Sequence, residues 1–334
     1  MNPSFVRIQP LIGYGPATLS GLEGRTIFQI PEWLSFVAKS QGAEIIQAAL
    51  KDGSQLIGYF AGLIVRKLGL KILGSPLPGW TTSYMGLNLA PNVPRPVAVQ
   101  ALIRFAFDDL GCAHMEMMDR HLTVEDVKRL GLQHRIFAGF EIDLSQSEDR
   151  LFANMSSACR RCIRKAEKNG VTIEEAHDKE FADEYYEQLQ DVFGKRHLVP
   201  TYDVNRVRDL IACMDGTNHL LLLRARDPNG RCIATGIFPA LNGTMHFWGG
   251  ASRQDSLAYR PNEALHWYGM KYWKARGMRL YDMGGGGEYK RKFGGYPIHV
   301  PWIRASKYLG ISFIRDLTKY MVYWRQSACG WVRT

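Results

Sequence analysis

Two patterns of hydrophobic residues alternate along the chain, and they predict that strands and helices alternate. Runs that are apolar throughout suit strands, and segments with apolar residues every three or four positions suit helices. In the first half, the main expected helices begin at Pro31 and Val97, and Thr123 caps a short one that runs to Leu130. The expected strands of this half are 43–51, 56–67, 68–73, 112–118 and 137–144.

The second half shows the same periods in a similar order. The expected helices are 148–169, 181–193, 204–214 and 262–275, and the expected strands are 171–175, 219–226, 232–240, 245–251 and one from Leu280. In each half, strands joined at a tight turn, Asp52-Gly53 or Asn242-Gly243, precede a helix, a glycine and a further strand. The chain is therefore predicted to be an α/β protein that repeats one unit.

The segment Arg279–Gly295 combines the end of a strand, four glycines and several cations. Glycines lose much backbone entropy on folding, so the run Gly284–Gly287 suits a place where the backbone passes close to another group or moves. Tyr289 and Lys290 follow directly, and an aromatic ring beside an ammonium group on such a loop can bind an anionic or polar substrate. A flexible surface loop with solvated charges is the alternative interpretation.

Charge narrows the classes of partner. The chain has 334 residues, a net charge of +10 and a pI near 9.3, which favours RNA, a phosphate-bearing substrate or an anionic membrane surface. The start of the sequence lacks the basic and apolar pattern of a secretory signal, and the longest apolar runs are too short to cross a bilayer. We therefore expect a cytoplasmic protein, with contact to the inner face of the membrane as an option.

The six cysteines are scattered and form no disulfide framework, which agrees with a reducing compartment. Cys159 and Cys162 are spaced as C-x-x-C, but they lie in a helical pattern and no second pair accompanies them. We interpret their spacing as incidental, and we expect no metal site.

Three stretches, in their order and spacing, resemble a known family: Arg161–Ile173, Tyr259–Trp267 and Tyr281–Gly295. Together with Pro31-Glu32-Trp33 near the start, they resemble the FemABX-like transferases and related bacterial acyltransferases of the GNAT fold. The resemblance implies two tandem GNAT-like domains, each a mixed, mainly antiparallel sheet flanked by helices. It places them at 1–145 and 146–302, the second carrying the active-site loop, with the tail 303–334 packing back on the first.

The family transfers an acyl or aminoacyl group to an amine without a metal or a covalent enzyme intermediate. An aromatic-lysine pair in the last loop of the second domain is thought to stabilise the reacting centre, and Tyr289-Lys290 matches it here. An ammonium at Lys290 would stabilise the oxyanion that forms when the amine attacks a carbonyl. Asp282 can orient that amine or accept its proton. Alternatively, Asp282 is a structural carboxylate that pairs with Lys290 or Arg291.

The candidate substrate-binding residues divide into three groups. Arg260 and Asn262 lie at the mouth of the 262–275 helix, where the arginine can hold a phosphate and the asparagine can act as an N-cap. The family often places acceptor contacts in the loop that holds Arg196, His197 and Tyr202. Trp33 and Tyr84 can line a cleft, although core packing is the favoured role of Trp33.

Three functional hypotheses follow. The favoured donor is aminoacyl-tRNA, with a cell-wall, peptide or amino-sugar amine, carried on a nucleotide- or lipid-linked precursor, as acceptor. The alternative is an acyl-CoA-dependent N-acetyltransferase, although the interval 249–261 lacks the glycine-rich loop that usually binds the CoA pyrophosphate. The third is a non-catalytic binding protein on the same fold. We expect no tightly bound cofactor and no DNA partner.

The tail from Trp302 to Thr334 interleaves aromatic and basic residues. A basic helix of this composition can lie on an anionic membrane, which would suit a lipid-linked acceptor. Packing of a C-terminal helix on the first domain is the favoured alternative.

Overall fold

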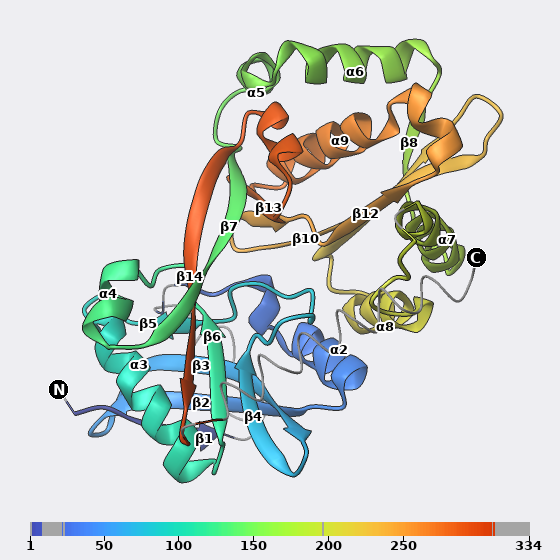
Figure 1. The fold of residues 1–334 in the computed structure, drawn as a ribbon. Helices are drawn as coiled ribbons and strands as arrows, with labels where there is room; N and C mark the ends of the chain where they lie inside the picture. The colour runs from blue at the N-terminus through green and yellow to red at the C-terminus, as the bar shows by residue number, and fades with distance from the viewer. Residues whose placement is uncertain (1, 9–21, 23, 196, 309, 311–334) are drawn as a thin grey trace. The chain divides into compact units, whose positions relative to one another are not determined.

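The computed structural model describes residues 2–8, 22, 24–195, 197–308 and 310 of the chain (Figure 1). It divides into two compact units, and each is described here by itself. Unit 1 holds the described residues up to 137 and from 299 onwards, and unit 2 holds residues 138–298. Two strands, β7 (Gln133–Asp143) and β14 (Tyr296–Ser306), carry the chain from one unit to the other.

Unit 1 is a mixed, mainly antiparallel sheet covered by short helices. The strand order is β1-β2-β3-β4-β6-β14, and only the pairing of β4 with β6 is parallel among those registered in this unit. Short β5 pairs with β3. Besides β14, the strands of this unit are β1 (Ser4–Ile8), β2 (Glu44–Asp52), β3 (Gln55–Lys67), β4 (Leu70–Ser75), β5 (Leu87–Leu89) and β6 (His114–Met118).

Proline, glycine and capping residues set the ends of the helices in unit 1. They are η1 (Ile27–Gln29), α2 (Pro31–Gln41), α3 (Arg95–Arg104), the π-helical turn η2 (Phe105–Asp109) and α4 (Val124–Arg129). Pro31 opens α2 and left-handed Gly42 (φ 59°) ends it. Thr123 Oγ1 accepts a hydrogen bond from the Asp126 amide at 3.1 Å, which confirms the predicted cap of α4.

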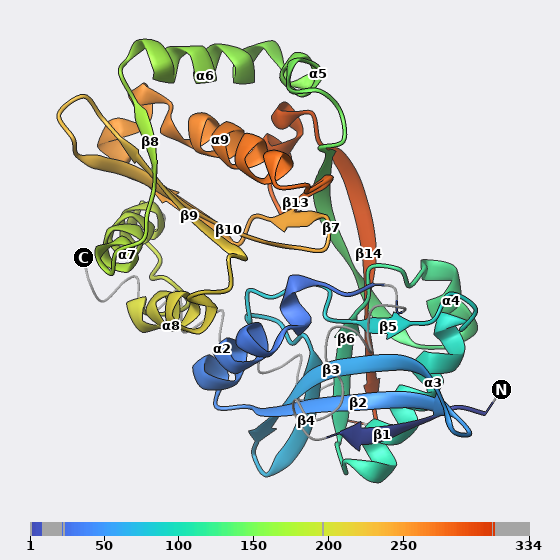
Figure 2. The ribbon, with the colours of Figure 1, turned by 180° about the vertical axis from the view of Figure 1, so that it is seen from behind.

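Unit 2 has a sheet that helices cover on both faces (Figure 2). Its strand order is β7-β13-β11-β10-β9-β8, with β12 also paired to β10. Besides β7, the strands of this unit are β8 (Thr172–Glu175), β9 (Leu220–Arg226), β10 (Cys232–Leu241), β11 (Thr244–His246), β12 (Gly249–Ser252) and β13 (Leu280–Gly285). The helices are α5 (Glu148–Asn154), α6 (Ser157–Lys168), α7 (Glu180–Gly194), α8 (Val204–Met214), η3 (Gln254–Tyr259), α9 (Pro261–Ala275) and η4 (Glu288–Phe293).

The prediction of one helix over 148–169 was wrong. The helix breaks into α5 and α6 at Met155, whose ψ of 149° is extended. Ser156 follows and accepts a hydrogen bond from the Cys159 amide at 3.2 Å through its hydroxyl oxygen. A serine in this position begins a new helix, so one amphipathic segment folds as two helices.

The single predicted strand 245–251 is split into β11 and β12. The Phe247 amide donates to Asp282 O of β13 at 2.9 Å, whereas the next amide, of Trp248, donates to Ile237 O of β10 at 3.0 Å. Two consecutive amides therefore bond in opposite directions, so that β11 stays beside β13 while β12 stays on β10. Among the registered pairings, β12 therefore bonds to β10 and β13 bonds to β11 and β7.

Three strands were not predicted: β1, β5 and β14. Residues Trp302–Ser306, which we assigned to a helical tail, instead pair with β6 within unit 1. Trp302 and Ile303 are buried there, so this segment is part of the core and does not form a surface helix. Residues 311–334 of the predicted tail lie outside the described part of the chain.

Candidate active site

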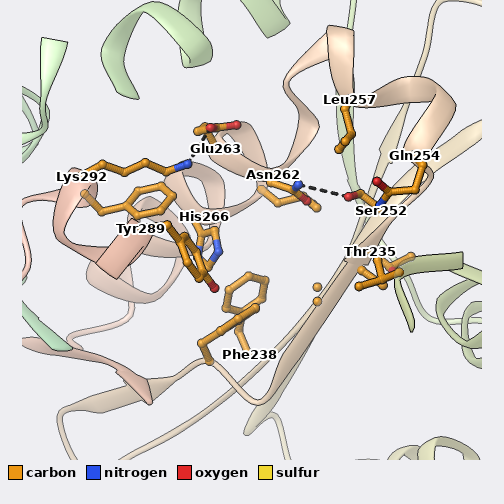
Figure 3. A pocket seen from close by; sticks show the side chains of 17 residues that line it. Thr235, Phe238, Ser252, Gln254, Leu257, Asn262, Glu263, His266, Tyr289 and Lys292 are labelled. Carbon is orange, nitrogen blue, oxygen red and sulfur yellow. Dashed lines mark hydrogen bonds and ion pairs between the residues drawn. The ribbon is translucent and has the colours of Figure 1, made fainter. Parts of the chain in front are cut away.

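A cavity of about 320 Å³ opens in unit 2 between β10, β12, the start of α9 and η4 (Figure 3). One end is aromatic and is formed by Phe238, His266 and Tyr289. The opposite end is polar and is formed by Thr235, Ser252 and Asn262. The cavity thus offers an apolar surface with hydrogen-bonding groups at one end, which is the usual composition of a small-molecule site.

Two glycines keep the floor of this cavity open. A Cβ atom on Gly236 would approach the Phe238 ring to 2.6 Å, and one on Gly250 would approach the Phe247 ring to 2.9 Å. Both aromatic rings lie against strand backbone that carries no side chain. Larger residues at these positions would displace the rings into the space that a substrate would need.

His266 is a neutral hydrogen-bonding group in the wall of the cavity. Its Nδ1 lies 2.6 Å from the Tyr281 hydroxyl. Burial, together with the charges of Lys290 and Lys292, lowers the pKa of His266 to about 3. Burial also raises the pKa of Tyr281 well above its usual value, so this pair is an uncharged imidazole and an uncharged phenol at neutral pH.

His266 and Tyr281 were not among the predicted site residues. Both occupy positions that periodicity assigns to the core, His266 on α9 and Tyr281 on β13. The only signal in the sequence was a histidine within the motif Tyr259–Trp267, and core histidines are common at such positions.

Tyr289 and the ion pair of Lys292 with Glu263 lie on the same side of the cavity as His266 (Figure 3). The Tyr289 side chain remains about half exposed. Lys292 Nζ contacts Glu263 Oε1 at 2.7 Å, which joins η4 to the first turn of α9. This ion pair fixes the loop that carries Tyr289 against the helix.

Lys290 is buried beside the cavity wall and is held by main-chain carbonyls. Its Nζ donates to Met283 O at 2.5 Å and to Gly285 O at 2.7 Å, and only 4% of the residue is exposed. Burial lowers the pKa of Lys290 to about 8, and the nearby charge of Asp282 partly opposes this effect. The group is therefore a desolvated ammonium at neutral pH, close to its titration point.

The glycine run explains how the main-chain carbonyl groups come to surround the Lys290 ammonium. Gly284, Gly286 and Gly287 all have positive φ, at 71°, 76° and 75°. The end of β13 therefore curls so that its carbonyl groups face the Lys290 side chain instead of a neighbouring strand. Other residues adopt this left-handed backbone only at a cost, which accounts for a run of glycines before the lysine.

Asp282 belongs to a row of buried titratable side chains across three strands. In the strand register it lies opposite Glu141 of β7 and opposite His246 of β11. Its Oδ2 is 3.7 Å from His246 Nδ1, and its Oδ1 accepts a hydrogen bond from the Gly284 amide at 2.6 Å. Only the Asp282 member of this row was predicted, because Glu141 and His246 join it through pairing of distant segments.

Arg260 and Asn262 lie at the start of α9, but the N-cap residue is Arg260 and not Asn262, which lies inside the helix after Pro261. The side chains of the two residues line two different sites. Asn262 Nδ2 donates to Ser252 Oγ at 3.1 Å and lines the cavity (Figure 3). Arg260, with a left-handed φ of 62°, instead lines a groove against α6 together with Arg161 and Lys165. Within the described part of the chain, none of these three cations forms an ion pair.

The thiols of the C-x-x-C pair do not share an environment. Cys159 is fully buried, and burial raises the pKa of its thiol to about 12. Cys162 is half-buried and lines the groove beside α6. Among the described residues, no group of histidine, cysteine and acidic side chains could hold a metal ion.

The remaining predicted residues are not gathered at the cavity. The Tyr202 hydroxyl lies 2.9 Å from that of Tyr185, which is fully buried behind β12. In unit 1, the Trp33 indole is fully buried and donates to Thr82 Oγ1 at 3.2 Å, and Tyr84 is buried against Phe137. Arg196 lies outside the described residues.

Comparison with known proteins defines the class. Residues 153–291 match the model of the acetyltransferase (GNAT) domain family, a range that covers α6, most of the residues lining the cavity and most of η4. No curated protein sequence matches the chain. Within the described residues, no helix is long and apolar enough to span a bilayer.

Solved structures extend the match to nearly the whole chain. FemX is 14% identical, with a TM-score of 0.70 over 89% of this chain and 97% of that one. A tandem GNAT protein from the clavulanic acid biosynthesis pathway is 11% identical, with a TM-score of 0.54 over 91% and 98%. The C-terminal domain of a putative lysylphosphatidylglycerol synthetase from Agrobacterium fabrum is 10% identical, with a TM-score of 0.54 over 84% and 89%.

Unit 2 therefore carries a GNAT acetyltransferase domain, and this domain supports an acyltransferase activity. The chain as a whole shares its fold with FemX and with a tandem GNAT protein, which match it along most of their lengths. The predicted fold class and the prediction of an acyltransferase are confirmed.

Proposed function

We propose that the protein transfers an aminoacyl group from an aminoacyl-tRNA to a primary amine of a cell-wall, peptide or amino-sugar precursor. One observation carries the proposal: a buried ammonium, Lys290, and a row of buried titratable groups around Asp282 both meet at the end of β13, next to an open cavity. This places a positive charge and a carboxylate at the same strand end. Both kinds of group can assist amide formation from an ester, the ammonium at the oxyanion and the carboxylate at the amine.

The chemistry would proceed in one attack and one collapse. The acceptor nitrogen attacks the ester carbonyl carbon, a C–N bond forms, and the carbonyl oxygen becomes an oxyanion. Collapse breaks the C–O bond to the tRNA ribose, and the ribose oxygen leaves with a proton that the amine has lost. Lys290 would stabilise the oxyanion, and Asp282 would hold the amine and take up its proton in transit.

The neutral pair of His266 and Tyr281 suits a different task. An imidazole with a pKa near 3 is too weak a base to take a proton from an ammonium group at neutral pH. It can, however, form a hydrogen bond with an uncharged carbonyl or amino group of the acyl chain. Together with Tyr289 on the same side, it would position the acyl group in the aromatic end of the cavity.

The groove between α6 and the start of α9 supports a phosphate-bearing donor. Arg161 and Lys165 are four residues apart on one helix, and like charges at this spacing repel. Arg260 adds a third positive charge at the N-terminus of α9, where the helix dipole is itself positive. Phosphate groups of a donor would relieve this repulsion, and the same helix start also borders the cavity.

An acyl-CoA is the second candidate donor. The observation in its favour is that the polar end of the cavity, Ser252 and Asn262, lies at the first turn of α9 within a matched GNAT domain. Against it, the interval between β12 and α9 is filled by the 3₁₀ turn η3 and contains no glycine. The two donors carry the same kind of charge but differ greatly in size.

A direct test combines binding and transfer. The chain would be mixed with a total aminoacyl-tRNA pool carrying labelled amino acids, or with labelled acetyl-CoA and longer acyl-CoAs, and with nucleotide-linked, lipid-linked and amino-sugar acceptors. We expect label from the aminoacyl-tRNA to appear on an amine, and a rise in melting temperature with charged tRNA. Lys290→Ala is expected to lower kcat by about a hundredfold or more.

Matched outcomes separate the alternatives. If only an acyl-CoA stabilises the protein and donates its acyl group, the protein is an acyl-CoA-dependent N-acetyltransferase and the tRNA proposal is wrong. If Lys290→Ala and Asp282→Ala both remain folded and fully active, the assigned chemistry is wrong. Arg291→Ala serves as the control, because this exposed cation lies next to Lys290 in sequence and pairs only with Glu288 and the Phe140 ring among the described residues.

A further inference from the structure

The turn between β3 and β4 in unit 1 exposes a leucine at its tip. Leu68 is 91% exposed and Leu70 is 38% exposed. On one side, the register of β2 with β3 begins at Glu44 opposite Ile64, and on the other, β6 begins opposite Ile72. The turn therefore extends past both neighbouring strands as a two-stranded projection (Figures 1 and 2).

The backbone of this turn does not favour leucine. Leu68 has a φ of 50° and Gly69 a φ of 78°, so two consecutive residues are left-handed, as in the tight turns that prefer Asn-Gly. A leucine side chain is strained in this conformation, and its exposure to water gains nothing. Neither local structure nor packing within the described residues explains the residue.

Cations surround the exposed leucines. Arg66 and Lys67 precede the turn and are exposed, and their side chains form no ion pair or hydrogen bond within the described residues. Lys71 follows and donates to Leu110 O at 2.9 Å, which ties the base of the projection to unit 1. The tip is therefore apolar, while its base carries unpaired positive charge.

This arrangement matches the layers of an anionic bilayer. A leucine that leads the projection would reach the boundary of the acyl chains, and cations set back along the strands would meet the lipid phosphates. A protein partner would instead need a pocket for one leucine ringed by acidic groups. Charge complementarity thus favours a lipid surface over a protein, and long basic side chains can extend toward headgroups while their stems stay apolar.

We propose that the β3–β4 turn, residues Arg66 to Lys71, is a membrane-contact site for anionic lipid. Leu68 enters the outer acyl layer, and Arg66 and Lys67 bind headgroup phosphates. This contact is independent of the transfer chemistry of unit 2. It would concentrate the enzyme at a surface where lipid-linked acceptors are found.

The test uses the full chain and sedimentation with vesicles of phosphatidylcholine alone or of phosphatidylcholine mixed with phosphatidylglycerol. We expect binding to the anionic vesicles only, and Leu68→Asn to weaken it about tenfold or more. Asparagine suits the left-handed turn, so this variant should melt at the same temperature as the wild type or higher. Loss of binding would then not reflect loss of folding.

Charge variants complete the experiment. Arg66→Gln and Lys67→Gln together should weaken binding about tenfold or more on anionic vesicles. Arg164→Gln with Lys168→Gln removes the same charge from an exposed helix of unit 2 and should have a much smaller effect. The proposal is overturned if the wild type does not bind, or if Leu68→Asn binds as well as the wild type, because the contact would then lie elsewhere.

Discussion

The Lys290 ammonium is held by two carbonyl groups in a site that excludes most water. Burial lowers the pKa of this ammonium to about 8, and the charge of Asp282 opposes part of that shift. The same two carbonyls also direct two of the three N–H bonds, so the remaining one is available for another acceptor. A lysine in such a state is suited to stabilise a developing negative charge.

A first prediction concerns stability and pH at this residue. Below about pH 8 the lysine is protonated in both the folded and the unfolded chain. Above it, the folded chain releases the proton while the unfolded chain keeps it to about pH 10.4, so the unfolded state binds more protons and stability rises with pH. Relative to Lys290→Met, the wild type should therefore gain up to about 3 kcal/mol between these values.

Denaturant unfolding of both proteins at several pH values would measure this difference. Lys128→Met, at an exposed position of α4, is the control and should track the wild type at every pH. A constant difference between wild type and Lys290→Met across this range would show that the lysine is not desolvated in the folded state.

At the scale of elements, the glycine run and the short helix η4 act together. The left-handed glycines turn the end of β13 toward Lys290, and the Lys292–Glu263 ion pair fixes η4 to α9. The sequence motif thus encodes a strand end shaped as a cradle. We predicted that the glycine run lets the backbone pass close to another group, and that group is the Lys290 side chain of the same motif.

Gly286→Ala tests the conformational part of this argument. A Cβ atom there would meet no atom within 4 Å, and φ is 76°, so the cost comes from the backbone alone. We expect a loss of about 1–2 kcal/mol in the free energy of unfolding. Gly194→Ala, in helical backbone with equal free space, should be neutral or slightly stabilising. Equal effects of the two changes would contradict a left-handed requirement at Gly286.

At the scale of the whole molecule, the net charge of +10 comes from two kinds of cation, those with an ion-pair partner and those without one among the described residues. Some cations are paired within the fold: Arg224, for example, binds Glu174, Asp178 and Glu184. Others, such as Arg161 and Lys165, face a groove without a partner among the described residues. Only the second kind can release counterions from a bound polyanion.

This difference predicts the salt dependence of tRNA binding. Arg161→Glu with Lys165→Glu should weaken binding and reduce the slope of log K against log salt by about 1 to 2. Arg164→Glu with Lys168→Glu changes the net charge equally on the same helix but outside the groove, and should reduce the slope less. Filter binding of charged tRNA over a range of salt concentrations would give both slopes. Equal slopes for the two pairs would mean that charge acts diffusely and not through the groove.

Much of the fold could be predicted because its signals are local. Helix starts at Pro31 and Thr123 follow from proline and capping chemistry, and α8 lies where its amphipathic period placed it, at Val204–Met214. The motif Tyr281–Gly295 was recognisable for the same reason, since its residues are neighbours in sequence. These features depend on short-range sterics and hydrogen bonds, which the sequence by itself determines.

Only the tertiary structure decided how the site is assembled. The break at Phe247 depends on a competition between Asp282 and Ile237 for consecutive amides. The neutrality of His266 depends on burial and on the charge of Lys290, 24 positions away in sequence. The row of Glu141, Asp282 and His246 depends on strand register. Each arises from contacts between distant segments, which periodicity does not specify, because it fixes the face of a residue but not its neighbour.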